Sequence, residues 1–167
     1  MPTVVRGALE LRKALKQFSP DLAKETQKEI ASILKPITRE ARGFVEVPLS
    51  GWAKRPNSHA RYPFVVSEVT RGIGYKTTPS KPNRRGFVAL AQIRNRSIAG
   101  AIYETAGRKT KGGNFVPHLD PLYATKNGNG RLIFRAWQRH QDDATKGVLE
   151  AIKTAANKLN ARATTNG

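Results

Sequence analysis

The sequence contains no cysteine and a single methionine among its 167 residues. Without cysteine the chain forms no disulfide bond and offers no thiolate to a zinc ion or to a catalytic site. It also lacks any apolar run near the roughly 20 residues that a membrane-spanning helix needs. These absences exclude disulfide-stabilised, thiol-dependent and helical membrane-spanning proteins. They leave a chain that is long enough to bury a hydrophobic core, and we expect residues 1–167 to form one domain.

Acidic residues are scarce as well. The 12 Asp and Glu stand against 30 Lys and Arg, which gives a net charge of +18. Half of this excess lies in residues 48–96, which hold ten basic residues and one acid, Glu68. A charge of this size attracts polyanions and acidic proteins. We therefore expect a nucleic acid or an acidic partner protein, with a solvated surface screened by salt as the alternative.

The first third of the chain has apolar residues at helical spacing. One set steps by three or four residues and predicts a short amphipathic helix: Val4, Ala8, Leu11, Leu15 and Phe18. Ser19 and Pro20 are typical of the cap and first position of a second helix, which we expect over residues 20–44. Pro36 lies inside that helix and is expected to bend it without ending it.

Short strands are predicted for the middle of the chain. The β-branched run 64–70 and the weaker run 72–77 predict a hairpin, and residues 87–94 and 131–134 predict further strands. A C-terminal helix is expected from about Ala136. The predicted fold is α+β, with an N-terminal helix pair and a long C-terminal helix packed on a small, mainly antiparallel sheet that carries long basic loops.

Residues 98–108 are the densest run of small and apolar residues outside the predicted helices. We expect a short core helix that ends where Gly107 can adopt a positive φ. Glu104 is placed among apolar neighbours and needs a partner, and Arg108 lies one helical turn away. We assign structural roles to Glu104, Gly107 and Arg108. A catalytic Glu104 is the weaker alternative, because spacing ties no other acid or histidine to it.

The remaining residues typical of catalysis or metal binding lack the required spacing. His59, His118 and His140 form no His-x-x-x-His or Glu-x-x-His pattern. His118 and Asp120 suit one half of an acid–base pair, but no nucleophile accompanies them, so loop polarity is the simpler interpretation. The sequence also has no glycine-rich nucleotide-binding loop. We therefore predict no catalytic residue, no cofactor and no metal, and we expect that the protein is not an enzyme.

Two basic loops, 53–61 and 77–86, are the strongest candidate site. Their basic side chains are Lys54, Arg55, Arg61, Lys81, Arg84 and Arg85. Both loops border the predicted hairpin, so they are expected to form one positive rim that contacts DNA or an acidic partner. Aromatic residues make up only 7% of the chain, which gives little support to a base-stacking platform. A third long loop, 109–130, mixes Gly, Pro and Asn with apolar residues and suits an arm that orders against a neighbouring chain.

Three segments of the chain, in this order, resemble a known family. The first is the helix pair leading through residues 33–42 into Val47-Pro48-Leu49-Ser50-Gly51. The second is Ala101-Ile102-Tyr103-Glu104-Thr105-Ala106-Gly107-Arg108, and the third is Gly130-Arg131-Leu132-Ile133-Phe134-Arg135-Ala136-Trp137 followed by a helix. Together they resemble the neck and tail-completion (head–tail joining) proteins of long-tailed bacteriophages, in particular those of phages that infect actinobacteria.

The resemblance implies a structural virion protein, made in the host cytoplasm and built into the head–tail junction. Its partners would be further copies of itself in a hexameric ring, head-closure or connector proteins, and tail-terminator or tail-tube proteins. Genomic DNA would pass through the ring, and no membrane, enzyme activity or cofactor is implied. The long basic loops depart from the family pattern and leave the layer open among neck ring, head-closure ring and tail terminator. The alternatives are a stand-alone basic nucleic-acid-binding protein and, more remotely, a small hydrolase using His118 and Asp120.

Overall fold

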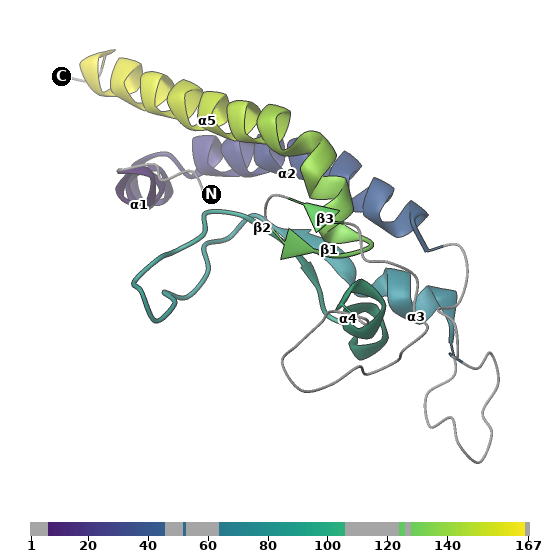
Figure 1. The fold of residues 1–167 in the computed structure, drawn as a ribbon. Helices are drawn as coiled ribbons and strands as arrows, with labels where there is room; N and C mark the ends of the chain where they lie inside the picture. The colour runs from purple at the N-terminus through teal and green to yellow at the C-terminus, as the bar shows by residue number, and fades with distance from the viewer. Residues whose placement is uncertain (1–6, 46–51, 53–63, 106–123, 126–127, 166–167) are drawn as a thin grey trace. The chain divides into compact units, whose positions relative to one another are not determined.

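The computed structural model of the chain describes residues 7–45, 52, 64–105, 124–125, 128–129 and 130–165. Helices dominate it, and two small sheets complete an α+β fold, as predicted from the sequence (Figure 1). The elements in chain order are α1 (Ala8–Phe18), α2 (Pro20–Gly43), α3 (Val66–Arg71), β1 (Ile73–Lys76), β2 (Gln92–Asn95), α4 (Ile98–Thr105), β3 (Ala124–Thr125), β4 (Gly128–Asn129) and α5 (Ile133–Thr165).

The two N-terminal helices follow the predicted pattern. A single buried residue, Ser19, separates them: its N–H donates to Leu15 O, and its carbonyl accepts the N–H of Ala23. α2 begins at Pro20, where a missing N–H costs no helical hydrogen bond. The helix runs on through Pro36. The bend expected there stays a prediction.

The predicted strand over 64–70 was wrong, and with it the hairpin. Residues 66–71 form the helix α3, in which Val69 is fully buried while Val65 and Val66 stay at least one third exposed. The N–H groups of Glu68 and Val69 both donate to Val65 O, which starts the helix. Strand preference of β-branched residues depends on pairing with a neighbouring strand, and neither of the two described sheets includes this segment.

The strands are fewer and shorter than predicted. β1 confirms the predicted 72–77 strand and forms a two-stranded sheet with β2, but only the last part of the predicted 87–94 strand is extended. β3 and β4 form a second, antiparallel pair within the predicted loop 109–130, with Ala124 opposite Asn129. The predicted strand 131–134 was wrong, because α5 already begins at Ile133.

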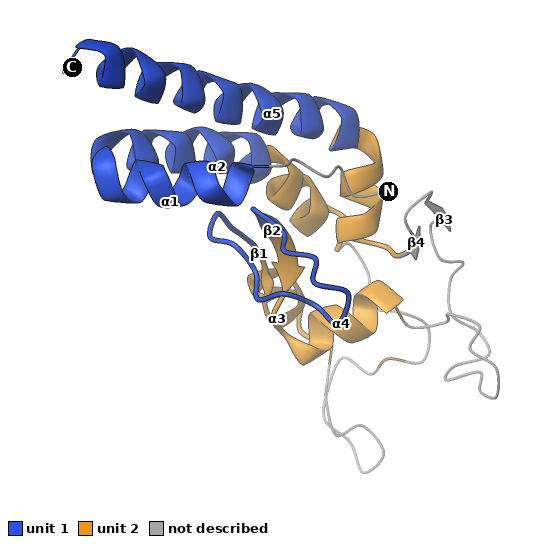
Figure 2. Cartoon of the chain, turned by 90° about the vertical axis from the view of Figure 1, so that its left-hand side faces the viewer, with its two compact units in different colours: residues 1–35, 75–92, 141–167 blue, residues 36–74, 93–140 orange. Residues whose placement is uncertain are grey.

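The chain divides into two compact units (Figure 2). Unit 1 comprises residues 1–35, 75–92 and 141–167, and unit 2 comprises residues 36–74 and 93–140. Both α2 and α5 contribute to each unit, so the division is not one between an N-terminal and a C-terminal half. The expectation of one domain over residues 1–167 stays a prediction, and the units are described separately below.

In unit 1, α1 and the N-terminal part of α2 pack with the C-terminal part of α5. The core cluster comprises Leu15, Leu22, Ala23 and Ala155, with Leu11 and Leu159 packed against it. Gly147 of α5 lies so close to α2 that a Cβ there would meet Ile33 Cδ1 at 3.0 Å. Small residues thus let the two helices approach closely, and volume added here would have to displace a core side chain.

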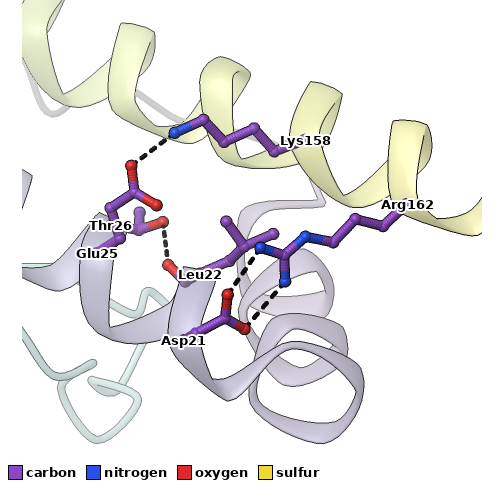
Figure 3. A network of polar contacts seen from close by, with 6 residues as sticks. All are labelled: Asp21, Leu22, Glu25, Thr26, Lys158 and Arg162. Carbon is purple, nitrogen blue, oxygen red and sulfur yellow. Dashed lines mark hydrogen bonds and ion pairs between the residues drawn. The ribbon is translucent and has the colours of Figure 1, made fainter.

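Two ion pairs join the same helices at the surface of unit 1 (Figure 3). The Arg162 guanidinium donates to both oxygens of Asp21, at 3.0 and 2.7 Å, and Lys158 Nζ donates to Glu25 Oε1 at 2.5 Å. The hydrogen bond from Arg162 lowers the pKa of Asp21. Exposed pairs of this kind contribute little stability, so the apolar core cluster contributes most of the stability that holds α2 against α5.

Unit 2 has its own core and its own polar ties. Its fully buried large side chains are Ile37, Val69, Ile73 and Leu132. The Arg42 guanidinium donates from Nε and Nη2 to Ile73 O, at 3.1 and 2.5 Å, which ties the end of α2 to β1. Trp52, Phe64 and Tyr103 form a ring cluster with centroids 5.3 to 6.4 Å apart.

Candidate functional site

The predicted basic loop 77–86 lies in unit 1 and contains an ordered turn at its end, residues 83–86. Asn83 occupies the first position and Gly86 the last, and the Gly86 N–H donates to Asn83 O at 2.9 Å. The Asn83 side chain accepts the N–H groups of Arg85 and Phe87, at 2.9 and 3.0 Å. Gly86 has φ +73°, which strongly favours glycine. Asn at the start and Gly at the end are typical of such a turn, so Arg84 and Arg85 occupy its two central positions.

A second set of hydrogen bonds closes the loop below the turn. The Ser80 N–H donates to Ala89 O at 2.8 Å, and the Ala89 N–H donates to Ser80 Oγ at 2.9 Å. The Asn83 N–H adds a bond to Phe87 O at 2.9 Å. These bonds order the backbone on both sides of the turn, so the two arginines are presented by a structured loop.

Arg12 of α1 anchors the base of this loop within unit 1. Its Nη1 donates to Thr77 O at 2.5 Å, and its Nη2 is buried with no hydrogen-bond partner among the described residues. Burial lowers the pKa of Arg12 from its ordinary value. The guanidinium borders a cavity of about 30 Å³ lined also by Thr26, Leu90 and Ile152, which is the space of about one water molecule. The sequence pattern placed Arg12 on the polar side of a helix and did not identify this role.

No acidic residue nearby in the sequence balances the positive charge of the turn. Lys81, Arg84 and Arg85 are all exposed. The 35 residues between Glu68 and Glu104 contain seven Lys and Arg and no Asp or Glu. A single guanidinium group can bind a carboxylate or a phosphate through two parallel hydrogen bonds. The turn is therefore suited to binding an anionic surface.

The other predicted basic residues lie outside the described part of the chain. These are Lys54, Arg55 and Arg61, and Gly107 and Arg108 of the core segment are also outside it. The single positive rim formed by both basic loops, and the pairing of Glu104 with Arg108, thus stay predictions. His59, His118 and Asp120 likewise fall outside the described residues.

Glu104 is buried, as predicted, and its described partners come from the start of α5. Its Oε2 accepts the N–H groups of Leu132 and Ile133 at 2.8 and 3.1 Å, and its Oε1 accepts that of Phe134 at 3.0 Å. The first N–H groups of a helix have no partner within the helix, and a carboxylate there also complements the helix dipole. Glu104 is therefore the cap of α5, supplied from 28 residues away.

Neighbouring residues hold this cap in place. A Cβ on Gly130 would overlap Glu104 Oε1, so only glycine leaves room for the carboxylate. Buried Arg131 donates from Nη1 to Tyr103 O at 3.2 Å. At the other end of α4, Ser97 Oγ accepts the Gly100 N–H at 2.8 Å and caps that helix. Sequence spacing pointed to a partner for Glu104 but gave no sign of α5, because the two segments meet only in the folded chain.

A further polar cluster in unit 2 was not predicted. Glu40 of α2 binds Arg139 Nη1 at 2.7 Å and also pairs with His140 Nε2. Burial raises the pKa of Glu40, but the hydrogen bonds from Arg139 and His140 outweigh it and hold the pKa below its ordinary value. The Arg135 and Arg139 guanidinium groups lie 4.1 and 5.2 Å from the Phe44 ring centre. These contacts join the end of α2 to the start of α5.

The described part of the chain contains no group of three His, Cys, Asp or Glu side chains placed to bind a metal ion. Its polar groups instead pair with helix ends, backbone carbonyls and one another. None of its helices is both long and apolar enough to cross a membrane. No family model, curated protein or solved structure matches the chain. Among the described residues the basic turn, residues 83–86, is the best candidate site, because its two exposed arginines are suited to binding an anion.

Proposed function

We propose that the chain is a structural subunit of a phage particle, forming a ring at the head–tail junction that joins the connector to the tail tube. Its partners are further copies of itself, a head-closure or connector protein, and a tail-terminator or tail-tube protein. DNA passes through the ring. The protein has no enzymatic role in this proposal, and it works through the surfaces that it presents to its neighbours.

One observation carries the proposal. Glu104 belongs to the second segment on which the family resemblance rests, and it caps a helix that begins in the third segment. The two segments, separated by more than 20 residues, are thus parts of one packed unit. The cap gives Glu104 of the second segment a structural role, so its presence there requires no catalytic function. Gly130, the first residue of the third segment, leaves the space that the carboxylate occupies.

The experiment is deletion of the gene from the phage genome, with complementation from a plasmid. The proposal expects filled heads and separate tails that fail to join, and restoration of whole particles by the wild-type chain. Mass spectrometry should detect the protein in purified complete particles. Normal particles without the gene, or complete particles that lack the protein, would overturn the proposal.

The basic turn favours a second candidate, a stand-alone nucleic-acid-binding protein. Arg84 and Arg85 lie exposed at its tip, and no acidic residue lies nearby in the sequence. This candidate expects the purified protein to bind duplex DNA at micromolar strength or tighter, with an affinity that falls steeply with salt. Binding of that kind, together with normal assembly in the deletion strain, would favour it over the ring subunit.

A further inference from the structure

The guanidinium group of Arg12 is a partly buried cation that its described surroundings do not neutralise. Its Nη1 donates to Thr77 O at 2.5 Å, whereas its Nη2 is buried and has no hydrogen-bond partner in the part of the chain that the structure describes. A backbone carbonyl accepts a hydrogen bond but supplies no negative charge. The ion pairs of the described residues do not include Arg12. Because buried charges in proteins are ordinarily paired, a counter-ion at Nη2 would be stabilised.

The cavity that Arg12 borders has no acidic residue in its wall. Residues of α1, α2, α5 and the segment before β2 line it, all of them in unit 1 (Figure 2). Apart from Arg12, its polar lining residues are Thr26 and Gln27, and the others are apolar. Asp21 and Glu25, the acids that precede these two on α2, form their ion pairs with α5 instead. The positive charge therefore faces a mostly apolar wall.

The two polar residues on α2 suit a bound anion. The Thr26 hydroxyl already donates to Leu22 O at 2.8 Å. The half-buried Gln27 side chain forms no hydrogen bond within the described residues, so its amide is available to the cavity. An amide can present either its NH₂ group or its oxygen, and beside an anion it would present NH₂. Arg12 and Gln27 thus offer N–H donors from two different helices.

We propose that this cavity binds one small monovalent anion of the size of chloride, held by Arg12 Nη2. The volume of about 30 Å³ is that of about one water molecule, which suits chloride and is too small for sulfate or phosphate. A water molecule could accept the same hydrogen bond but would leave the guanidinium charge uncompensated. The net charge of +18 also raises the local concentration of anions.

The site has a consequence for the loop that carries the basic turn. Arg12 is the residue that ties α1 to Thr77 at the base of this loop. An anion that neutralises Arg12 favours its packed position and so stabilises unit 1 around the loop. The inference is independent of the proposed ring, because it concerns a single copy of the chain.

The first experiment measures thermal unfolding of the full-length protein while sodium chloride replaces sodium gluconate at a constant ionic strength of about 150 mM. Gluconate is too large for the cavity. If chloride is present at about ten times its dissociation constant and binds only the folded state, the ratio of folded to unfolded protein rises about elevenfold. At this chain length the melting temperature should rise by roughly 3–6 °C. Bromide should have a similar effect.

A matched pair of variants separates this site from general binding of anions to a basic protein. Arg12→Met and Lys13→Met each remove one positive charge and keep a long unbranched side chain, and Lys13 is an exposed neighbour on α1. Lys13→Met should keep the full increase in melting temperature on changing gluconate for chloride. Arg12→Met should lose this increase, whatever its own stability in gluconate. Equal increases in the two variants would overturn the inference.

A second experiment needs no variant. Crystals of the wild-type protein soaked in sodium bromide should show an anomalous scattering peak within hydrogen-bond distance of Arg12 Nη2. A water molecule at this position without an anomalous signal would overturn the inference. Bromide peaks confined to exposed lysines and arginines, which indicate an adventitious ion only, would overturn it as well.

Discussion

Replacing Glu104 tests the best-defined contact of unit 2. The carboxylate is 5% exposed and accepts three backbone N–H groups at the start of α5. In Glu104→Ala these donors lose their partner, and water has poor access because Leu132 is fully buried. Loss of a helix cap costs about 0.5–2 kcal/mol, and a buried donor left unpaired costs about 1–3 kcal/mol. We expect the free energy of unfolding to fall by about 3 kcal/mol.

The assay is urea unfolding followed by circular dichroism at the helical band. At this chain length, a loss of about 3 kcal/mol corresponds to a melting temperature lower by roughly 6–12 °C. Glu104→Gln keeps one acceptor oxygen without the charge and should lose about half as much. Glu68→Ala, which removes an exposed carboxylate from α3, serves as the control and should stay within about 0.5 kcal/mol of wild type. If Glu104→Ala were no more destabilising than this control, the capping argument would be wrong.

Three further predictions concern packing and pH. Gly130→Ala places a Cβ against the capping carboxylate and should destabilise the chain by about 2–4 kcal/mol. Gly43→Ala is the control, because a Cβ there meets nothing within 4 Å, and it should not destabilise the chain. Urea unfolding compares the free energies of unfolding of the two variants. Gly147→Leu should cost about 1–3 kcal/mol by calorimetry, while Gly147→Ala should be near neutral because helix propensity offsets the tight contact. The lowered pKa of Asp21 means that its pairing with Arg162 stabilises the fold above the ordinary carboxyl pKa and is lost as pH falls through the folded value. Arg162→Gln should therefore be less stable than wild type at pH 7 and equal to it near about pH 2, and equal differences at both would contradict this.

Local chemistry predicted several features of the structure correctly. Ser19 and Pro20 mark the change from α1 to α2, since a cap and a residue without an N–H suit a helix start wherever it occurs. Residues 77–86 were expected only as a basic loop; the turn that Asn83 and Gly86 close there was not predicted, although its residue types are typical of one. The small and apolar run beginning at Ile98 formed the expected short helix, with Glu104 buried in it.

The errors arose where the outcome depended on residues distant in the sequence. Residues 66–71 have the composition of a strand but form a helix, because strand formation needs a neighbouring strand. Residues 131–134 were expected to be extended, yet the carboxylate of Glu104 starts a helix there. In both cases the local preference pointed to a strand, and a long-range interaction or its absence decided the structure.

By itself, the sequence determined the net charge, the absence of thiol chemistry, the change from α1 to α2 at Ser19 and Pro20, and the short helix that holds Glu104. Each of these depends on residue type or on neighbours within about one helical turn. Only the tertiary structure decided that Glu104 caps α5 and that Arg12 of α1 anchors the loop that carries the basic turn. Such features require segments far apart in the chain to meet, and the packing within each unit sets the geometry of that meeting.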